Sequence, residues 1–314
     1  MKVLVTGANG FVGKAVLLRL NCMSGLSAIG SVRDAGRAAD PGFPLMTVGE
    51  LSAQTDWSRA LAGIQSVVHT AARVHVMQEA SADPVEEFRR VNVQGTLNLA
   101  RQAAAAKVRR FVFVSSIKVN GEATQLGRPF MADDSPAPLD AYGISKMEAE
   151  QGLREVARQT GMEVVIIRPP LVYGPGVKAN FASMMRWLRR GVPLPLGAIH
   201  NQRSLVALGN LVDLIVVCLT HPAAAHQNFL VSDGEDVDTP ELLRRMGRAM
   251  GCPAYLIPVP VSWLKLAASL IGKPDVARRL CGSLQVDIEK TWLLLGWKPP
   301  LTLDEGLKKA AEGI

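Results

Sequence analysis

The sequence has few cysteines, no long hydrophobic run and no low-complexity tract. Its four cysteines are far apart and lack the paired spacing of a metal or redox centre, so we expect core residues of a cytoplasmic protein and no metal site. No apolar run reaches the ~18 residues that a helix needs to span a bilayer. The nearest, Trp263–Ile271, lies between prolines. It predicts a buried or partner-facing helix, with a helix on a membrane surface as the alternative.

Acidic residues are also fewer than basic ones, 28 against 35, which gives a net charge of +7. Such a balance can attract nucleic acid, an anionic membrane or a phosphorylated ligand. The basic residues are scattered in short pairs rather than gathered in one arm, which indicates solvated helix faces and no nucleic-acid partner. The hydrophobic content of 48% is enough for a large core, in one large or two closely joined domains.

The first thirteen residues carry the clearest functional signal. Lys2–Thr6 is a short aliphatic run typical of a buried parallel strand, and the residues from Phe11 onward predict a helix. Between and within these elements, Gly7, Gly10 and Gly13 follow the spacing G-x-x-G-x-x-G. These glycines permit a tight turn, a close approach of backbone amides and a close helix–strand contact, which together predict a pyrophosphate site for a dinucleotide. Since the motif begins at residue 2, no signal peptide is expected.

The rest of the pattern predicts an α/β fold, a Rossmann doubly wound parallel sheet with a smaller C-terminal α/β substrate-binding region. We place the dinucleotide-binding domain at residues 1–170 and the substrate-binding region at 171–314, with some chain crossing between them. Further strands are expected at Ala28–Val32, Phe43–Val48, Ser66–Thr70, Arg110–Ser115 and Glu163–Arg168, with helices at Asp56–Ala62 and Pro84–Ala106.

The end of the second strand bears on the choice of cofactor. Arg33 precedes Asp34 there. An arginine can accept the 2′-phosphate of NADP, whereas an acidic residue hydrogen-bonds the ribose hydroxyl of NAD. The order of the two residues gives a slight preference for NADP(H), with NAD(H) as the alternative.

A strand-ending serine and a Tyr-x-x-x-Lys pair form the predicted chemical centre. Ser116 follows a strand whose carboxyl end should face the ligand crevice. Tyr142 and Lys146 are four residues apart and so project from one helical face. A lysine ammonium and an oxidised nicotinamide nearby would bring the Tyr142 pKa towards neutrality, so that Tyr142 can exchange a proton with a substrate oxygen that Ser116 also binds. His69 follows two valines and is expected to be a packed histidine rather than a catalyst.

Together these motifs resemble the extended short-chain dehydrogenases/reductases, in the branch of NAD-dependent nucleotide-sugar epimerases, dehydratases and reductases. The resemblance covers nearly the whole chain. It implies an enzyme that acts on a UDP-sugar at C4, and a homodimer formed through the long helices Pro84–Ala106 and Asp140–Gly161.

The resemblance also assigns residues to the two ligands. It implies that Asn92 is a structural amide tying the fourth and fifth strands together near the cofactor. The cofactor-binding residues that we expect are Gly7, Asn9, Gly10, Phe11, Val12, Gly13, Arg33, Glu50, Leu51, Thr70, Ala71, Ala72, Arg73, Asn92, Ser115, Tyr142, Lys146, Pro169, Leu171 and Val172. The expected substrate-binding residues are Lys118, Asn180 and Arg203, with the last two at the diphosphate.

Three reactions at C4 are compatible with such a site: epimerisation, dehydration and reduction of a 4-keto group. No carboxylate follows Ser116, which argues against dehydration. Arg33 favours reduction, as does Leu171, which stands where sugar epimerases often have Asn. We therefore expect a UDP-4-keto-6-deoxy-N-acetylhexosamine 4-reductase of surface polysaccharide biosynthesis, similar to those that make UDP-N-acetylquinovosamine. The alternative is a UDP-hexose or UDP-N-acetylhexosamine 4-epimerase with retained NAD.

Two other classes share parts of the pattern. A non-catalytic NADP(H)-sensing regulator would typically lack the Tyr142 and Lys146 pair. A steroid- or flavonoid-type reductase shares the segment from Arg168 to Gly174, but Asn180 and Arg203 favour a diphosphate instead.

Overall fold

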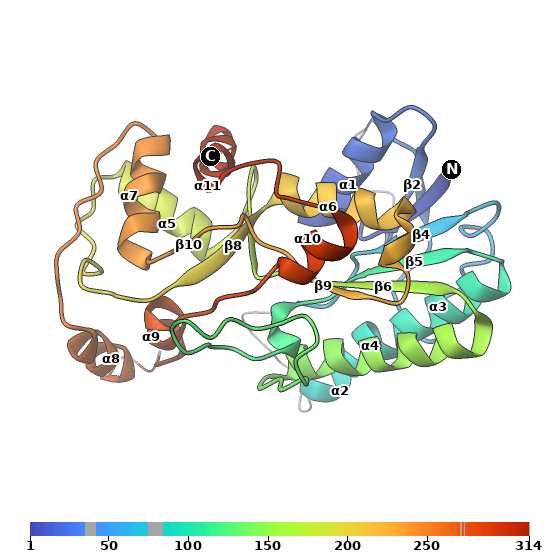
Figure 1. Ribbon diagram of the computed structural model, residues 1–314, viewed down its shortest axis with the longest axis horizontal. Helices are drawn as coiled ribbons and strands as arrows, with labels where there is room; N and C mark the ends of the chain where they lie inside the picture. The colour runs from blue at the N-terminus through green and yellow to red at the C-terminus, as the bar shows by residue number, and fades with distance from the viewer. Residues whose placement is uncertain (35–41, 75–83, 271, 273, 314) are drawn as a thin grey trace.

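The protein is built on a seven-stranded parallel sheet with helices on both faces (Figure 1). A computed structural model describes residues 1–34, 42–74, 84–270, 272 and 274–313. The strand order is β3-β2-β1-β4-β5-β6-β9, so the direction of winding reverses between β1 and β4. The strands are β1 (Lys2–Thr6), β2 (Ser27–Val32), β3 (Leu45–Thr47), β4 (Ser66–His69), β5 (Arg110–Val114), β6 (Glu163–Arg168) and β9 (Asn228–Leu230). The predicted doubly wound parallel sheet is confirmed.

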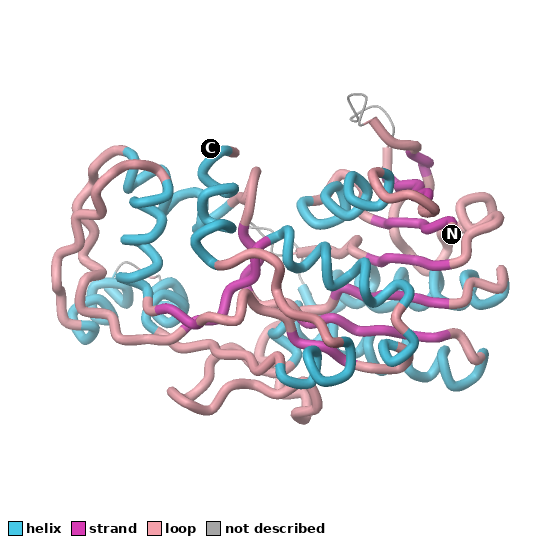
Figure 2. The backbone as a smooth tube through the Cα atoms, turned by 45° about the horizontal axis from the view of Figure 1, so that its top comes forward, coloured by secondary structure: helices cyan, strands magenta, loops and turns pink. Residues whose placement is uncertain are grey.

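Helices pack on both faces because the strands are apolar on both sides. Every residue of β5 is buried, as expected for a central parallel strand. On one face α1 (Phe11–Asn21) packs against α6 (Leu208–Thr220). The opposite face carries α2 (Pro84–Phe88), the π-helical segment η2 (Arg89–Gly95), α3 (Thr96–Ala105) and α4 (Ala141–Thr160), as Figures 1 and 2 show.

A smaller α/β region stands beside the carboxyl edge of the large sheet (Figure 2). In its three-stranded sheet, β8 (Arg203–Ala207) pairs in parallel with β7 (Leu171–Tyr173) and antiparallel with β10 (Asp236–Val237). Its helices include α5 (Ala179–Arg189), α7 (Thr239–Ala249), α8 (Val261–Leu270), α9 (Pro274–Cys281) and α11 (Leu303–Glu312).

The chain crosses between the two regions after residue 170. Helix α6 covers the large sheet, β9 pairs with β6 at its edge, and α10 (Glu289–Leu295) contacts β9. Short 3₁₀ turns occur at η3 (Ile117–Val119) and η4 (Pro222–Ala224). A single boundary at residue 170 would therefore divide β6 from β9, although both strands belong to the large sheet.

Several expected elements differ from the structure. The predicted helix at Asp56–Ala62 is a series of turns, in which the buried Trp57 anchors the segment to the core. The predicted long helix at Pro84–Ala106 runs on as expected, but its middle widens into η2 around Asn92. The apolar run at Trp263–Ile271 forms α8, which has no buried residue; Ile271 itself lies outside the described residues. In the part of the chain that the structure describes, no helix is long and apolar enough to cross a membrane.

Candidate active site

The glycine motif forms a tight corner between β1 and α1. Gly7 has a φ of 71°, which L-residues with side chains rarely adopt, and the Gly10 amide donates to the Gly7 carbonyl at 2.8 Å. A Cβ at Gly13 would lie 2.3 Å from the Gly7 carbonyl oxygen. Phe11 and Val12 open α1 and pack against the core. The first amides of α1 are thus held at the carboxyl end of β1, where the helix dipole favours an anion.

A cleft of about 840 Å³ opens beside this corner, at the carboxyl ends of β1, β2 and β4. Nine of the expected cofactor residues line it: Gly7, Asn9, Gly10, Arg33, Glu50, Leu51, Ala71, Ala72 and Arg73. Other lining residues were not expected, among them Ala8, Ser31, Trp57, Arg90 and Lys178, and Asp34, the acid of the NAD(H) alternative, also lines the cleft. Lys178 comes from the second region, and only the tertiary fold brings it here.

The remaining expected cofactor residues do not line this cleft. They are Phe11, Val12, Gly13, Thr70, Asn92, Ser115, Tyr142, Lys146, Pro169, Leu171 and Val172. Most of them hold the walls in place or lie further along the carboxyl edge. Thr70, for example, donates its hydroxyl to the Thr6 carbonyl at 2.6 Å and so ties the ends of β1 and β4 together.

His69 is a packed histidine, as the valines before it predicted. Its Nδ1 lies 2.6 Å from Thr6 Oγ1, and its Nε2 lies 2.9 Å from Thr96 Oγ1. Thr6 Oγ1 already accepts two backbone amides, from Thr70 and Ala71, and therefore donates its own proton to Nδ1. Burial, and then the charge of Lys146, lower the His69 pKa to about 3. The ring stays neutral and links β1, β4 and α3.

The elements that Asn92 connects are not the ones that the resemblance implied. Its Oδ1 accepts the Arg73 amide at 2.7 Å, and its Nδ2 donates to the Arg73 carbonyl and to Ser145 Oγ, both at 3.0 Å. The sequence analysis placed this amide between the fourth and fifth strands. Instead it fixes the loop after β4 against α4, because η2 turns its side chain towards that helix.

Tyr142 and Lys146 share one face of α4, as their spacing predicted. Helix α4 starts after Asp140, whose side chain accepts the Gly143 amide as an N-cap. Lys146 Nζ donates to the Val114 carbonyl at 2.8 Å and lies 4.1 Å from the centre of the Phe113 ring. The amine is therefore held under the carboxyl end of β5.

Within the protein itself, the pKa values of this pair are set mainly by burial, and the lowered Tyr142 pKa expected beside an oxidised nicotinamide remains a prediction. Burial, followed by the Asp140 carboxylate, raises the Tyr142 pKa to about 12 rather than lowering it. Burial lowers the Lys146 pKa to about 7, although Glu150 opposes the shift. The protein alone thus disfavours the phenolate, and further positive charge is needed to stabilise it.

The two serines after β5 have different roles. Ser116 is half-buried and accepts the Lys118 amide at 3.3 Å, while Ser115 is buried and donates its hydroxyl to Glu150 Oε1 at 2.6 Å. The Ser115 hydroxyl is thus engaged within the protein, and its expected contact with the cofactor remains a prediction. The Lys118 ammonium pairs with Asp140 and, at 3.5 Å, with Glu122. Its expected role at the substrate remains a prediction.

A buried ion pair, which was not expected from the sequence, connects the elements around Tyr142 and Lys146. Arg168 donates to Glu150 Oε1 at 2.9 Å and Oε2 at 2.6 Å, and both side chains are only 2% exposed. Arg168 also donates to Asn120 at 2.9 Å. The pair thereby joins α4, β6 and the segments that follow β5. No sequence signal pairs these residues, because they are 18 positions apart on different elements.

The segment that follows β6 lies against the turn after Ser116. The Pro169 carbonyl accepts the Ile117 amide at 3.0 Å, which holds it beside the turn after Ser116. Leu171 and Val172 begin β7, and Leu171 is exposed. The nearby Tyr173 is a core residue whose hydroxyl donates to Asp233 at 2.7 Å, so it takes no part in the chemistry.

The expected diphosphate residues lie in the second region. Asn180 is exposed in the first turn of α5, and Arg203 begins β8. Arg203 donates to the Gly282 carbonyl at 3.0 Å, and burial lowers its pKa. The cost of burying a guanidinium is consistent with either a structural or an anion-binding role. Both substrate assignments remain predictions.

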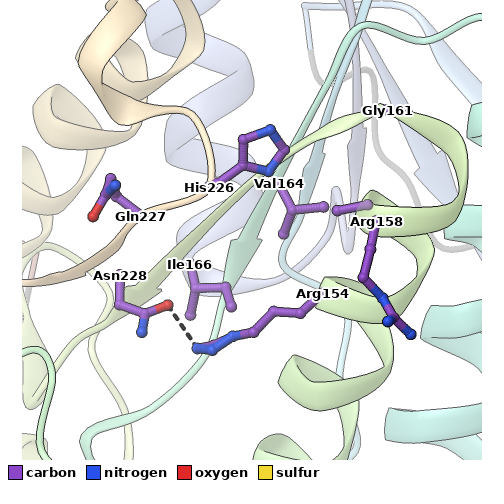
Figure 3. Close-up of a pocket in the computed structure, with 9 residues that line it drawn as sticks. Arg154, Arg158, Gly161, Val164, Ile166, His226, Gln227 and Asn228 are labelled. Atoms are coloured by element: carbon purple, nitrogen blue, oxygen red, sulfur yellow. Dashed lines mark hydrogen bonds between the residues drawn. The ribbon is translucent and has the colours of Figure 1, made fainter.

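A second depression, of about 390 Å³, lies at the opposite edge of the sheet (Figure 3). It is bounded by the last turns of α4 and the start of β9, where Arg154 donates to Asn228 at 2.8 Å. This is the amino end of the parallel strands, whereas doubly wound folds bind their ligands at the carboxyl end. We therefore take the cleft beside the glycine corner as the candidate site. No cluster of metal ligands occurs among the described residues.

Comparison with known proteins agrees with this geometry. Residues 3–232 match the sequence model of the NAD dependent epimerase/dehydratase family. The chain is 51% identical over 313 residues to UDP-glucose 4-epimerase of Vibrio cholerae, covering 99% of this chain and 95% of that protein.

Two solved structures share the fold. The UDP-glucuronic acid 4-epimerase of Bacillus cereus, in complex with NAD, superposes with a TM-score of 0.80 at 20% identity, over 100% of this chain and 96% of the other. The UDP-glucose 4-epimerase of Thermotoga maritima, with UDP-glucose, superposes with a TM-score of 0.78 at 22% identity, over 100% and 98%.

The buried ion pair makes a testable prediction about stability. Glu150→Gln leaves the Arg168 guanidinium buried without its counter-charge, so we expect a loss of about 3–5 kcal/mol in the free energy of unfolding. Glu155→Gln is the matched control on the same helix, because it removes an exposed pair with Arg158 and should cost less than about 1 kcal/mol. Urea unfolding of both variants measures the difference. Equal losses would contradict this role for Glu150.

Lys146 predicts a specific dependence of stability on pH. Its pKa of about 7 in the folded protein is below the ordinary value of 10.5, so above pH 7 the unfolded chain binds more protons at this site than the native protein does. The lysine therefore destabilises the fold at low pH, and this penalty falls as pH rises from about 7 to 10.5. Lys146→Met should remove that rise, measured as the difference between wild-type and variant urea unfolding across the window. Parallel curves would show that the pKa is not lowered.

Proposed function

Because the chain belongs to the NAD-dependent epimerase/dehydratase family, we propose that it is a UDP-sugar 4-epimerase that retains NAD through each turnover. The observation that carries this proposal is the likeness, over nearly the whole length, to a UDP-glucose 4-epimerase. It fits the 4-epimerase alternative better than the 4-reductase that the sequence analysis prefers. The residues after Ser116 still argue against dehydration, since no carboxylate stands there.

The proposed cofactor is therefore NAD(H) rather than NADP(H). The lean towards NADP(H) depended on Arg33, and the NAD-dependent family does not support it. Asp34 lines the cleft together with Arg33, so a carboxylate is present where the ribose hydroxyl of NAD would be recognised. The cleft suits a dinucleotide, with the amides of the glycine corner at the pyrophosphate and Glu50 and Leu51 further along its wall.

The catalytic groups then act on the C4 hydroxyl of the sugar. When bound, oxidised NAD would supply a hydride acceptor and a positive charge. Tyr142 takes the hydroxyl proton as C4 loses its hydride, and Ser116 hydrogen-bonds the same oxygen. Tyr142 would return the proton to the same oxygen when the hydride is given back to C4 on the opposite face. No net oxidation occurs, so no second substrate is needed.

Lys146 has a supporting part in this chemistry. Held by the Val114 carbonyl, its amine lies one turn from Tyr142 under the end of β5. A charged ammonium there favours the phenolate and offsets the burial that raises the Tyr142 pKa. The proposal includes the homodimer expected through the helical stretch Pro84–Ala106 and α4, and sedimentation velocity would measure this assembly.

Replacing the proton acceptor tests the proposed reaction. Tyr142→Phe should lower the interconversion of UDP-glucose and UDP-galactose by roughly 10²–10⁴-fold while NAD remains bound, because only the phenolic oxygen is lost. The matched control is Tyr255→Phe, since Tyr255 is exposed and does not line the cleft. Chromatography of the nucleotide sugars, without added cofactor, measures turnover. Retained turnover in Tyr142→Phe would exclude this role.

The cofactor of the freshly purified protein separates epimerase from reductase. We expect tightly held NAD, released only on denaturation, and we expect Asp34→Ala to lower its content more than Arg33→Ala does. Denaturing release followed by mass analysis measures the amount in each variant. A protein that lacks NAD and binds NADPH exchangeably would favour the 4-reductase instead.

A further inference from the structure

Helix α8 presents an apolar stripe that the described parts of the protein leave uncovered. Its inner residues Val261 and Leu264 pack against the core of the smaller region. On the outer face, Trp263, Leu266 and Leu270 are 70%, 63% and 79% exposed. They follow the spacing i, i+3, i+7 and therefore form one continuous stripe.

The stripe is part of a larger apolar end of the molecule. Tyr255 and Ile257 precede α8 and are about half exposed. Backbone hydrogen bonds join Leu194 to both of them, which places the end of α5 and the turn after it alongside. We call residues 186–194 and 255–270 the distal tip. Figure 1 shows α8 at the end of the molecule furthest from the large sheet.

The distal tip is also devoid of negative charge. No acidic residue occurs in the sequence between positions 164 and 212 or between 242 and 274. Exposed basic residues are present in both segments, including Arg186, Arg189, Arg190 and Lys265. Exposed aromatic and aliphatic side chains that are surrounded by basic residues are typical of a surface that binds an anionic bilayer.

We propose that the distal tip docks on an anionic lipid bilayer, with α8 lying in the plane of the interface. Trp263 and the leucines enter the boundary between headgroups and acyl chains, where an indole is favoured. The arginines at the end of α5 contact the lipid phosphates. A second copy of the chain is a poorer occupant, because a two-fold contact through this surface would bring two sets of arginines together.

Vesicle binding tests the proposal with a matched pair of variants. Leu266→Glu places a carboxylate in the stripe, whereas Leu293→Glu places one on α10, at a leucine that is 65% exposed. The intact protein should sediment with vesicles of equal parts phosphatidylglycerol and phosphatidylcholine, and only weakly with phosphatidylcholine alone. Leu266→Glu should lower the partition coefficient at least about tenfold, and Leu293→Glu should change it less than about twofold. Raised salt should weaken binding of the intact protein.

Several outcomes would overturn the docking surface. The first is failure of the intact protein to bind anionic vesicles, and the second is an equal effect of the two variants on binding. The third is a change of oligomeric state on Leu266→Glu in sedimentation velocity, which would assign the stripe to a contact with a second copy. Thermal unfolding checks that both variants fold. The proposal is independent of the reaction, and turnover in solution should be unchanged in both variants, so its failure is distinguishable from failure of the proposed function.

Discussion

The buried pair of Glu150 and Arg168 is the interaction on which the position of α4, and with it the proposed catalytic pair, depends. Glu150 lies one turn beyond Lys146 on α4, and Arg168 ends β6. Their hydrogen bonds to each other, and those to Ser115 and Asn120, connect that helix to the end of β6 and to the segment that follows β5. Burying two charges is costly, and their attraction repays the cost only when the geometry is good and the remaining polar atoms are bonded. Here both conditions are met, so the pair fixes the position of α4 rather than simply adding stability.

The glycine corner, on the cofactor side of the site, is likewise held in place by contacts within the chain. The corner at Gly7 and Gly13 leaves no space for a side chain, and Thr6, Thr70 and His69 hold the two neighbouring strand ends beside it. The side-chain polar atoms of these three residues all have partners within the fold. The walls of the cleft and the first amides of α1 are therefore preorganised by contacts within the chain.

The tyrosine is the exception to this preorganisation. Burial and Asp140 push its pKa up to about 12, so the protein by itself holds Tyr142 as a neutral phenol. The proposed epimerisation would need Tyr142 both to take and to return a proton. Under the proposed function, the positive charge of a bound cofactor would lower this pKa, and proton transfer would then be coupled to cofactor binding.

The sequence by itself determined the sheet, the glycine corner, the packed histidine and the Tyr142 and Lys146 pair, because each follows from short-range periodicity or spacing along one element. The tertiary structure decided what depends on distant contacts. It turned the Ser115 hydroxyl to Glu150, brought Lys178 to the cleft, directed Asn92 to Arg73 and Ser145, and returned β9 to the first sheet. It also decided the direction of the Tyr142 pKa, because desolvation depends on everything packed around a group and not on its neighbours in sequence. Which residues form a helix is local information; which charges meet inside the protein is not.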